Sequence, residues 1–409
     1  MTVIAESVVL FGEFGCGNLG NEASLDAVLA WIRTRPEITI GSITREPDVV
    51  AREHAIASVS MFGDRSRLSW LPRPLRKVAQ KLSDPLTIAS RLRPGQLVVV
   101  PGTGVFEQAM SGPPWGLPLS MFGLALAVRA RRARLALVGV GASYDTRRSV
   151  RLLTRGIVAL SEFVSVRDEY SKAAFGSIGA DATRTTVFPD VAFSLVEDVP
   201  GDVVAPATGP AEGGLRVGLG VISYHDPDDH EGGQQIAQEY EATITEFCGW
   251  LVDQGHQVEL LVGDASDGPL AEQVVAAVAG RGPGRACFAG YPDYRSLLHR
   301  VRSLDVVVGS RYHNLIFGLM NGTPVMSVGY ADKCERLLAA AGLGSYALRL
   351  ERVTVDDLQH VFGDLIAHLP QATRSAQRYR TDAAAGARAH RDLFLTSCLQ
   401  LEPVVAVAP

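Results

Sequence analysis

Cysteine pairs and long apolar runs are both missing from this sequence. The five cysteines form no Cys-x-x-Cys pair, and their odd number leaves at least one thiol outside any set of disulfides. This excludes a disulfide-built extracellular scaffold and favours a reducing cytosol. The longest uncharged windows, residues 108–128 and 312–331, are interrupted by Gly, Pro and Asn, so membrane-spanning helices are not expected.

A basic charge balance and a secretory signal are also lacking. The net charge is −5, which disfavours a nucleic-acid partner. No basic stretch precedes the first apolar run and no cleavage pattern follows it, so we do not expect a secreted protein. Only four lysines accompany 35 arginines among abundant Ala and Gly, a bias typical of a GC-rich bacterial genome. The length of 409 residues favours two domains.

Short apolar segments that end in glycine alternate with segments of helical periodicity. This alternation predicts βαβ units around parallel sheets, and the near-continuous apolar strands indicate burial on both faces. We expect strands over residues 7–12, 38–43, 97–101, 135–141 and 163–167, and then over residues 215–222, 257–262, 305–309 and 324–329. The predicted fold class is α/β, with two Rossmann-like domains.

Composition marks the domain boundaries. Residues 197–214 are rich in Pro, Gly and Ala without periodicity, so they are expected to link the domains. We predict an N-terminal domain over residues 1–196 and a C-terminal domain over residues 215–370. Residues 371–409 contain an Ala- and Arg-rich helical pattern, and this helix is expected to pack back on the N-terminal domain.

Residues 61–96 form a basic insertion in the first domain. Eight Lys and Arg stand there against two Asp, a local charge of +6. A solvated, Arg-rich surface accounts for this pattern. The alternative is an amphipathic surface that contacts anionic lipid headgroups, with Trp70 at the interface.

A glycine-rich loop follows the first predicted strand. Its sequence GCGNLG, residues 15–20, satisfies G-x-G-x-x-G before a helix, a pattern found at dinucleotide sites. However, Asn18, Asn21 and Glu22 carry polar side chains that suit a hydroxyl-rich ligand better than a pyrophosphate. The structural alternative is a strand-to-helix turn with Asn21 as helix N-cap.

Two further segments place ligand-binding residue types after predicted strands. PGTGVFEQ, residues 101–108, supplies Gly104 and Glu107 at a point where glycine lets a ligand approach the backbone. VSVRDEYSKAAF places Arg167 and Asp168 between a strand and a helix. Asp168 suits an N-cap, and Arg167 suits either an ion pair with a nearby acid or a clamp on a carboxylate or phosphate.

The segment of residues 304–343 carries the strongest functional signal. A buried strand ends before Ser310, which is expected to cap the next helix, so Arg311 and His313 fall in its first turn. Free N–H groups and the helix dipole favour an anion there, and Arg311 adds positive charge. His313 is then either a proton donor beside that anion or a core histidine. Lys333 opens the following helix.

Taken in order, these motifs resemble the polysaccharide pyruvyl transferase family. The resemblance covers residues 8–345 and rests on GCGNLGNEASLDAVL, PGTGVFEQ, VGVGASYD, VSVRDEYSKAAF, FPDVAF, and SRYHNLIFGLMNGTPVMSVGY followed by DKCERLLAAAGL. It implies two Rossmann-like domains facing a cleft, similar to type B glycosyltransferases, and we expect the acceptor on the side of the N-terminal domain and phosphoenolpyruvate on the side of the C-terminal domain. It also implies transfer of a pyruvyl group from phosphoenolpyruvate to two sugar hydroxyls as a cyclic ketal.

The resemblance further implies roles for individual residues. The family's phosphoenolpyruvate-binding R-x-H motif falls on Arg311 and His313, with a second arginine on Arg167. His313 would give a proton or assist phosphate departure. Glu22, Glu107 and Asp168 are the candidate bases for the hydroxyls, and the sequence leaves the choice open. The other expected substrate-binding residues are Ser310, Lys333, Asn18, Asn21, Gly104 and Glu107. Many relatives carry Asp where Asn21 stands.

No metal-ligand spacing occurs, so no metal cofactor is expected. The resemblance implies phosphoenolpyruvate as the donor substrate. The expected partner is a glycan or glycolipid acceptor, and the expected location is the cytoplasm, with peripheral contact at the inner face of the membrane. One alternative is a nucleotide-sugar-dependent glycosyltransferase in which Asp332 or Glu335 binds the ribose. Another is a non-catalytic scaffold at the membrane, which would not need Arg311 or His313.

Overall fold

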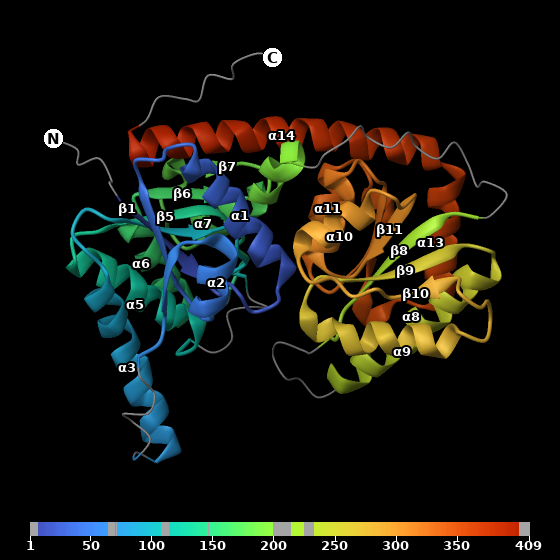
Figure 1. The fold of residues 1–409 in the computed structure, drawn as a ribbon, viewed down its shortest axis with the longest axis horizontal. Coiled ribbons are helices and arrows are strands. Elements are labelled where there is room, and N and C mark those ends of the chain that lie inside the picture. Colours follow the sequence, from blue (N-terminus) through green and yellow to red (C-terminus); the bar gives the residue numbers. More distant parts are fainter. Residues whose placement is uncertain are drawn as a thin grey trace. The chain divides into compact units, whose positions relative to one another are not determined.

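The chain folds into two compact units, each an α/β layer structure (Figure 1). The structure, a computed structural model, describes residues 7–63, 70, 72–107, 114–145, 147–198, 214–224 and 233–400. Unit 1 comprises Met1–Cys16, Asn21–Ser194 and Ala385–Pro409, and unit 2 comprises Gly17–Gly20 and Leu195–Ala384. Most of the predicted linker, and residues 64–69 and 71 of the basic insertion, lie outside the described residues.

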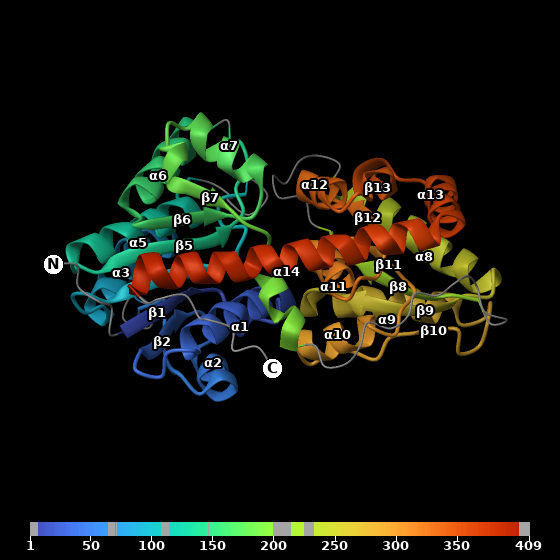
Figure 2. The same ribbon diagram turned by 90° about the horizontal axis from the view of Figure 1, so that it is seen from above.

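Unit 1 is built on a seven-stranded parallel sheet in the order β3-β2-β1-β4-β5-β6-β7, which Figure 2 shows from above. The strands are β1 (Ser7–Gly12), β2 (Thr39–Thr44), β3 (Ala57–Ser60), β4 (Leu97–Pro101), β5 (Arg134–Val140), β6 (Phe163–Val166) and β7 (Thr185–Val187). From β1 the chain adds β2 and β3 on one side of the sheet, and from β4 on it adds strands on the other side, so the strand order reverses between β1 and β4. Open α/β sheets bind ligands beyond the carboxyl ends of the strands at such a switch point.

Helices cover both faces of this sheet. They are α1 (Leu19–Arg33), α2 (Pro47–His54), α3 (Arg73–Arg91), α5 (Leu117–Ala130), α6 (Arg148–Leu160) and α7 (Glu169–Ser177), with the short helices η2 (Ala182–Arg184) and η3 (Val191–Asp198). In Figure 1 the C-terminal part of α14 (Leu369–Leu399) lies on the side of the sheet opposite α3, α5 and α6. Its residues from Ala385 on belong to unit 1.

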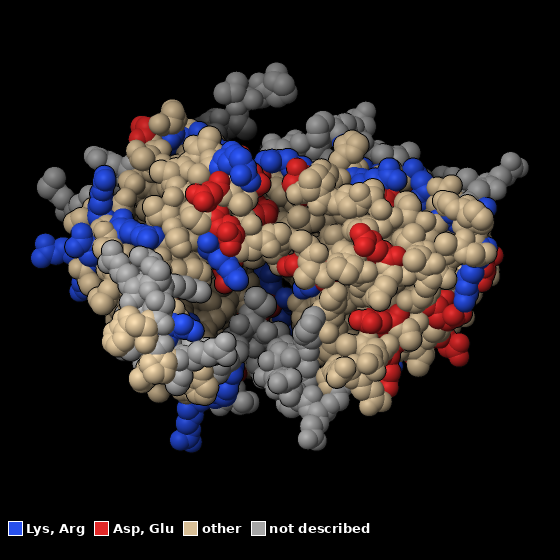
Figure 3. Space-filling model, turned by 60° about the horizontal axis from the view of Figure 1, so that its bottom comes forward, with Lys and Arg blue, Asp and Glu red and all other residues tan. Residues whose placement is uncertain are grey.

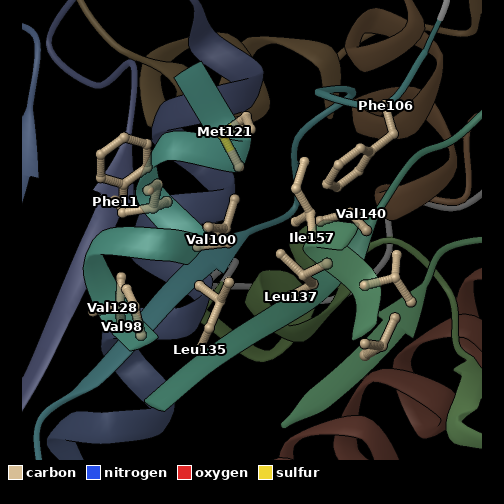
Figure 4. Packing of buried hydrophobic residues seen from close by; sticks show 14 of the residues in the cluster. Phe11, Val98, Val100, Phe106, Met121, Val128, Leu135, Leu137, Val140 and Ile157 are labelled. Carbon is tan, nitrogen blue, oxygen red and sulfur yellow. The ribbon is translucent and has the colours of Figure 1, made fainter. Parts of the chain in front are cut away.

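A hydrophobic core cluster of unit 1 lies between the sheet and α3, α5 and α6. Figure 4 shows Val100 and Leu137 of neighbouring strands directed toward the helices that carry Met121 and Ile157. Each such side chain, when fully buried, stabilises the fold by about 1.5–3 kcal/mol. This packing fixes the strand ends that carry the polar loops.

Unit 2 repeats the pattern with a six-stranded parallel sheet in the order β10-β9-β8-β11-β12-β13. The strands are β8 (Arg216–Val221), β9 (Gln257–Val262), β10 (Ala286–Cys287), β11 (Val306–Gly309), β12 (Val325–Gly329) and β13 (Ala347–Arg349). The helices are α8 (Gly233–Asp253), α9 (Gly268–Val278), α10 (Tyr294–Val301), α11 (Tyr312–Met320), α12 (Asp332–Ala340) and α13 (Val355–Ala367), with η4 (Ala265–Asp267), η5 (Gly344–Tyr346) and η6 (Leu350–Arg352). Here the switch point lies between β8 and β11.

The predicted α/β class is confirmed, and every predicted strand is present with each end within one residue of its expected place. Four further strands, β3, β7, β10 and β13, escaped prediction, and each is the edge strand of its sheet. Within the described ranges, no helix is long and apolar enough to cross a membrane.

Candidate functional site

Arg311 stands at the switch point of unit 2, at the N-cap of α11. Its Nε donates to Asp267 Oδ2 at 2.8 Å and its Nη2 donates to Asp267 Oδ1 at 2.7 Å. Asp267 is fully buried, while the Arg311 side chain is 22% exposed. Burial works to lower the pKa of Arg311, but the hydrogen bond and negative charge of Asp267 outweigh it and raise the pKa. The guanidinium is therefore permanently charged and held in one orientation.

The start of α11 retains hydrogen-bond donors that can hold an anion. Within the part of the chain that the structure describes, the guanidinium of Arg311 donates hydrogen bonds to Asp267 alone, so its remaining N–H groups are available to a ligand. Its side chain does not cap the helix. Because Asp267 balances one positive charge, an anion bound here also depends on the helix dipole and on further cations nearby.

Ser310 does not cap α11, contrary to the sequence-based expectation. Arg311 itself has extended backbone and occupies the N-cap position, so the helix begins one residue later than predicted. Ser310 is fully buried, and its hydroxyl lies 2.8 Å from the hydroxyl of Tyr240 on α8. Ser310 thus fastens the end of β11 to α8.

His313 lies in the first turn of α11, and its ring packs against the Cα of Gly20. A Cβ on Gly20 would lie 1.9 Å from His313 Nδ1, so only glycine leaves room for the ring. The ring also contacts Tyr312 and Phe317, with centroid separations of 5.5 and 6.2 Å. The third glycine of the G-x-G-x-x-G loop therefore positions an imidazole.

The loop before α1 is bound to the end of β9. Asn18 Nδ2 donates to Asp264 Oδ2 at 3.1 Å, and the backbone N–H of Leu19 donates to the Gly263 carbonyl at 3.0 Å. Gly17 has a φ of +83°, a conformation that favours glycine. Asn18, predicted to bind substrate, is thereby engaged in a hydrogen bond within unit 2.

Lys333 supplies a second cation near α11. Its Nζ lies 5.6 Å from the ring centroid of Tyr312 and 5.4 Å from that of Tyr330. Such contacts orient an ammonium group without neutralising it. The acidic residues considered for a ribose site, Asp332 and Glu335, both pair with Arg349, at 2.7 and 3.4 Å.

In unit 1, Arg167 is buried and paired with two carboxylates. It forms an ion pair with Glu107, and its Nη1 lies 3.7 Å from Asp190 Oδ2. A Cβ on Gly104 or Gly141 would meet the Glu107 carboxylate within 3 Å, so these glycines make room for the pair. Of the two interpretations of Arg167, the internal ion pair is the one observed.

The three candidate bases lie in different environments. Asp168 is the N-cap of α7 and accepts a hydrogen bond from the Ser171 N–H at 2.7 Å, as predicted for a cap. Glu107 is the partner of Arg167. Glu22 combines a raised pKa with an oxygen that accepts no hydrogen bond from a described residue. Its Oε1 accepts a 2.6 Å bond from the Gly15 N–H, and its Oε2 is buried without a hydrogen-bond partner among the described residues.

Burial raises the pKa of Glu22 to about 7, and the hydrogen bond from Gly15 offsets only part of this effect. Such a carboxyl exchanges protons near neutral pH. Glu22 lies in the first turn of α1, two residues after Gly20. Asn21 also lies inside this helix and is not its N-cap, which corrects the structural alternative; its Nδ2 donates to the Glu13 carbonyl at 3.4 Å.

The family comparison is decisive for classification. The family model of polysaccharide pyruvyl transferases matches residues 18–332. The chain belongs to the polysaccharide pyruvyl transferase family. The match begins inside the glycine loop at Asn18, includes Arg167, Arg311 and His313, and ends at Asp332. No curated protein matches this pyruvyl transferase family member.

Solved structures share the fold of this family member at low sequence identity. S. aureus MnaA in complex with UDP is 10% identical, with 97% of this chain and 99% of that chain covered and a TM-score of 0.65. The UDP-GlcNAc 2-epimerase of Neisseria meningitidis is 10% identical, with 97% and 100% covered and a TM-score of 0.61. A glycosyltransferase of Rickettsia africae is 11% identical, with 96% and 98% covered and a TM-score of 0.55. These likenesses confirm the similarity to glycosyltransferases in fold.

The sequence did not lead us to predict a role in this site for three of its residues, Asp264, Asp267 and Tyr240. The two aspartates directly follow the predicted strand of residues 257–262, in VGDASD. Acidic residues just after a buried strand are a signal that could have found them. Tyr240 gives no such signal, because it lies in the middle of a long helix.

Proposed function

We propose that this pyruvyl transferase family member moves a pyruvyl group from phosphoenolpyruvate to two hydroxyls of a sugar on a cell-surface glycan or glycolipid precursor. The observation that carries the proposal is the start of α11, where Arg311 is fixed by Asp267 beside His313. Phosphoenolpyruvate has a carboxylate and a phosphate, so it needs directional cationic donors. Arg311, Lys333 and the N-terminus of α11 are the groups of unit 2 that meet this need.

The reaction begins with proton transfer to C3 of phosphoenolpyruvate, which makes C2 electrophilic. A sugar hydroxyl then adds to C2 and gives its proton to a base. The bond between C2 and the phosphate oxygen breaks, and phosphate leaves with the bonding electron pair. A second hydroxyl adds to C2, loses its proton and closes the ketal. We assign the proton transfer to C3, or assistance to phosphate departure, to His313.

We assign the base to Glu22 among the three candidates. A base for a hydroxyl must be deprotonated at the working pH and must have a lone pair that is not committed elsewhere. The carboxylates of Glu107 and Asp168 are held by Arg167 and by the start of α7, respectively. The pKa of Glu22, raised to about 7 by burial, and its unpartnered Oε2 favour it.

We also propose that α3 makes peripheral contact with the cytoplasmic face of a membrane. In Figure 1 the N-terminal end of α3 projects from the rest of unit 1. Trp70, just before this helix, is 77% exposed, and Leu75 is 57% exposed. The helix carries five basic residues and one acidic residue, which suits an anionic surface.

Phosphate release tests the proposed reaction. The purified protein is incubated with phosphoenolpyruvate and a panel of pyranosides, and the products are examined by mass spectrometry for a ketal-linked pyruvate. We expect phosphate release that depends on the pyranoside. Parallel incubations with nucleotide sugars test the glycosyltransferase alternative. Sugar transfer from a nucleotide donor without phosphate release from phosphoenolpyruvate would overturn the proposal.

A further inference from the structure

A pocket of about 270 Å³ opens at the switch point of unit 1, and its lining is largely apolar. Phe11 and Val100 come from the carboxyl ends of β1 and β4, Ile88 comes from α3, and Leu117 and Met121 come from α5. Figure 4 shows Phe11, Val100 and Met121 in this part of the core. The volume approaches the lower limit of small-molecule pockets, about 300 Å³. Neither phosphoenolpyruvate nor a sugar calls for such an apolar surface.

Part of the pocket lining is polar, where the chain leaves β1 and β4 and enters α1. It consists of Glu13, Asn21, Thr103 and Gly104, of which Asn21 and Gly104 are among the expected substrate-binding residues. Carboxylate, amide and hydroxyl groups of this kind hydrogen-bond the hydroxyls of a sugar. The helices α3 and α5 add three more polar residues to the lining, Lys81, Asp84 and Ser120, so an apolar interior is combined with polar groups from the strand ends and from the helices.

On the other side the pocket reaches the helices that carry exposed apolar side chains. Leu86 of α3 is 72% exposed, and Trp115 and Leu119, at the start of α5, are 69% and 36% exposed. Lys81 Nζ joins the two helices by donating to Ser120 Oγ at 2.7 Å and to the Gly116 carbonyl at 3.3 Å. Figure 3 shows Lys and Arg side chains at its lower left, around α3, with no acidic side chain coloured there.

These features together describe an amphiphilic ligand. We propose that the pocket binds the hydrocarbon chain of a glycolipid acceptor, next to a sugar that the polar residues after β1 and β4 hold. The proposal rests on the proposed function in taking a sugar as the acceptor. It adds a separate binding site whose occupancy can be measured without catalysis.

Alkyl glucosides of increasing chain length test the pocket. Binding of hexyl, heptyl and octyl β-glucoside, each below its micelle-forming concentration, is measured by calorimetry. Affinity is expected to rise about fourfold for each added methylene, the fold-change that corresponds to ~0.8 kcal/mol. The same affinity for all three glucosides, or no binding, would overturn the proposal.

Two substitutions on one helix provide the matched comparison. Leu117→Trp places a large ring in the pocket and should abolish the dependence on chain length. Leu126→Trp, at a position of the same helix that is 48% exposed and outside the pocket lining, should keep it. If Leu117→Trp lowers the melting temperature, Val105→Trp on the loop after β4 fills the pocket from another side. An unchanged chain-length dependence in a folded pocket variant would refute the site.

The outcomes separate this inference from the proposed reaction. Chain-length-dependent binding without phosphate release from phosphoenolpyruvate would support the pocket and refute pyruvyl transfer. Phosphate release with simple pyranosides but without any chain-length dependence would support transfer and refute the pocket.

Discussion

Asp267 holds Arg311 by two hydrogen bonds, of 2.8 and 2.7 Å, and its carboxylate is fully buried. Removing the arginine side chain would leave that buried charge uncompensated, at a cost of about 3–5 kcal/mol of stability. Arg311→Ala would therefore confuse a binding defect with an unfolding defect. A more informative substitution keeps the positive charge at position 311 but removes the two-bond geometry of the guanidinium with Asp267.

We predict that Arg311→Lys weakens phosphoenolpyruvate binding by about 10- to 100-fold. Lysine lacks the planar guanidinium group, whose several N–H donors can bond Asp267 and the ligand at the same time. Calorimetric titration measures this. As a control, the double variant Arg311→Gln with Asp267→Asn removes both charges and should fold without binding phosphoenolpyruvate. Unchanged affinity in Arg311→Lys would exclude Arg311 as the anchor.

The second prediction concerns Gly20 and the ring of His313. In Gly20→Ala the new Cβ would lie 1.9 Å from Nδ1, so the imidazole must move. A displacement of this size should lower turnover by about 10²-fold with little effect on the circular dichroism spectrum. Gly176→Ala is the matched control, because it also adds a methyl group to a helical glycine and has no atom within 4 Å of the new Cβ. Equal activity of the two variants would remove His313 from the chemistry.

Sequence patterning found the buried strands of both sheets because their side chains are apolar on both faces. It missed the four edge strands, whose burial is lower and irregular, as in Ala57–Ser60, where exposed and half-buried residues alternate. Arg311 and His313 stood out because they follow a buried strand. The choice among Glu22, Glu107 and Asp168 depended on long-range partners, such as Arg167 for Glu107, and no local pattern contains that information.

The third prediction is a pH profile for Glu22. As a base it must be deprotonated, so turnover should rise with pH and level off above the raised pKa of about 7. Glu22→Gln should lower turnover by about 10²–10⁴-fold, retain phosphoenolpyruvate binding and remove this limb of the profile. Asp168→Asn is the comparison, since the asparagine oxygen can still accept the Ser171 N–H bond and cap α7, so only the carboxylate is lost. If Asp168→Asn rather than Glu22→Gln removed the limb, the assignment would reverse.

The fourth prediction concerns the fully buried His390 in unit 1. Its ring stacks on Phe188 with centroids 4.5 Å apart, and its Nε2 lies 2.7 Å from Ser165 Oγ. Burial lowers the pKa of His390 to about 3, whereas an unfolded histidine titrates near 6.5.

Between these two pKa values the unfolded chain binds a proton that the folded chain does not. The free energy of unfolding should therefore fall as the pH decreases from about 6.5 toward 3, by up to ~1.4 kcal/mol per pH unit. In His390→Phe this contribution disappears, so the difference in stability from the native protein should change with pH below 6.5. Urea unfolding at pH 7, 6 and 5 measures it. For the exposed His299, the substitution His299→Phe should change the free energy of unfolding by the same amount at every pH. A change that is likewise independent of pH for His390→Phe would contradict the prediction.

The last prediction tests the basic helix α3 as a membrane contact. Each Lys or Arg near an anionic leaflet contributes about 1 kcal/mol, and salt weakens the attraction. Lys81 is left unchanged, because its ammonium group already joins α3 to Ser120. Replacing Arg73, Arg76 and Lys77 by Gln should reduce sedimentation with phosphatidylserine-containing liposomes by at least tenfold at low salt. Replacing three exposed arginines elsewhere in unit 1, Arg129, Arg148 and Arg155, removes the same charge and should leave sedimentation nearly unchanged. If both triple variants lost binding equally, net charge alone would account for it, and if neither lost it, α3 would be an ordinary solvated helix.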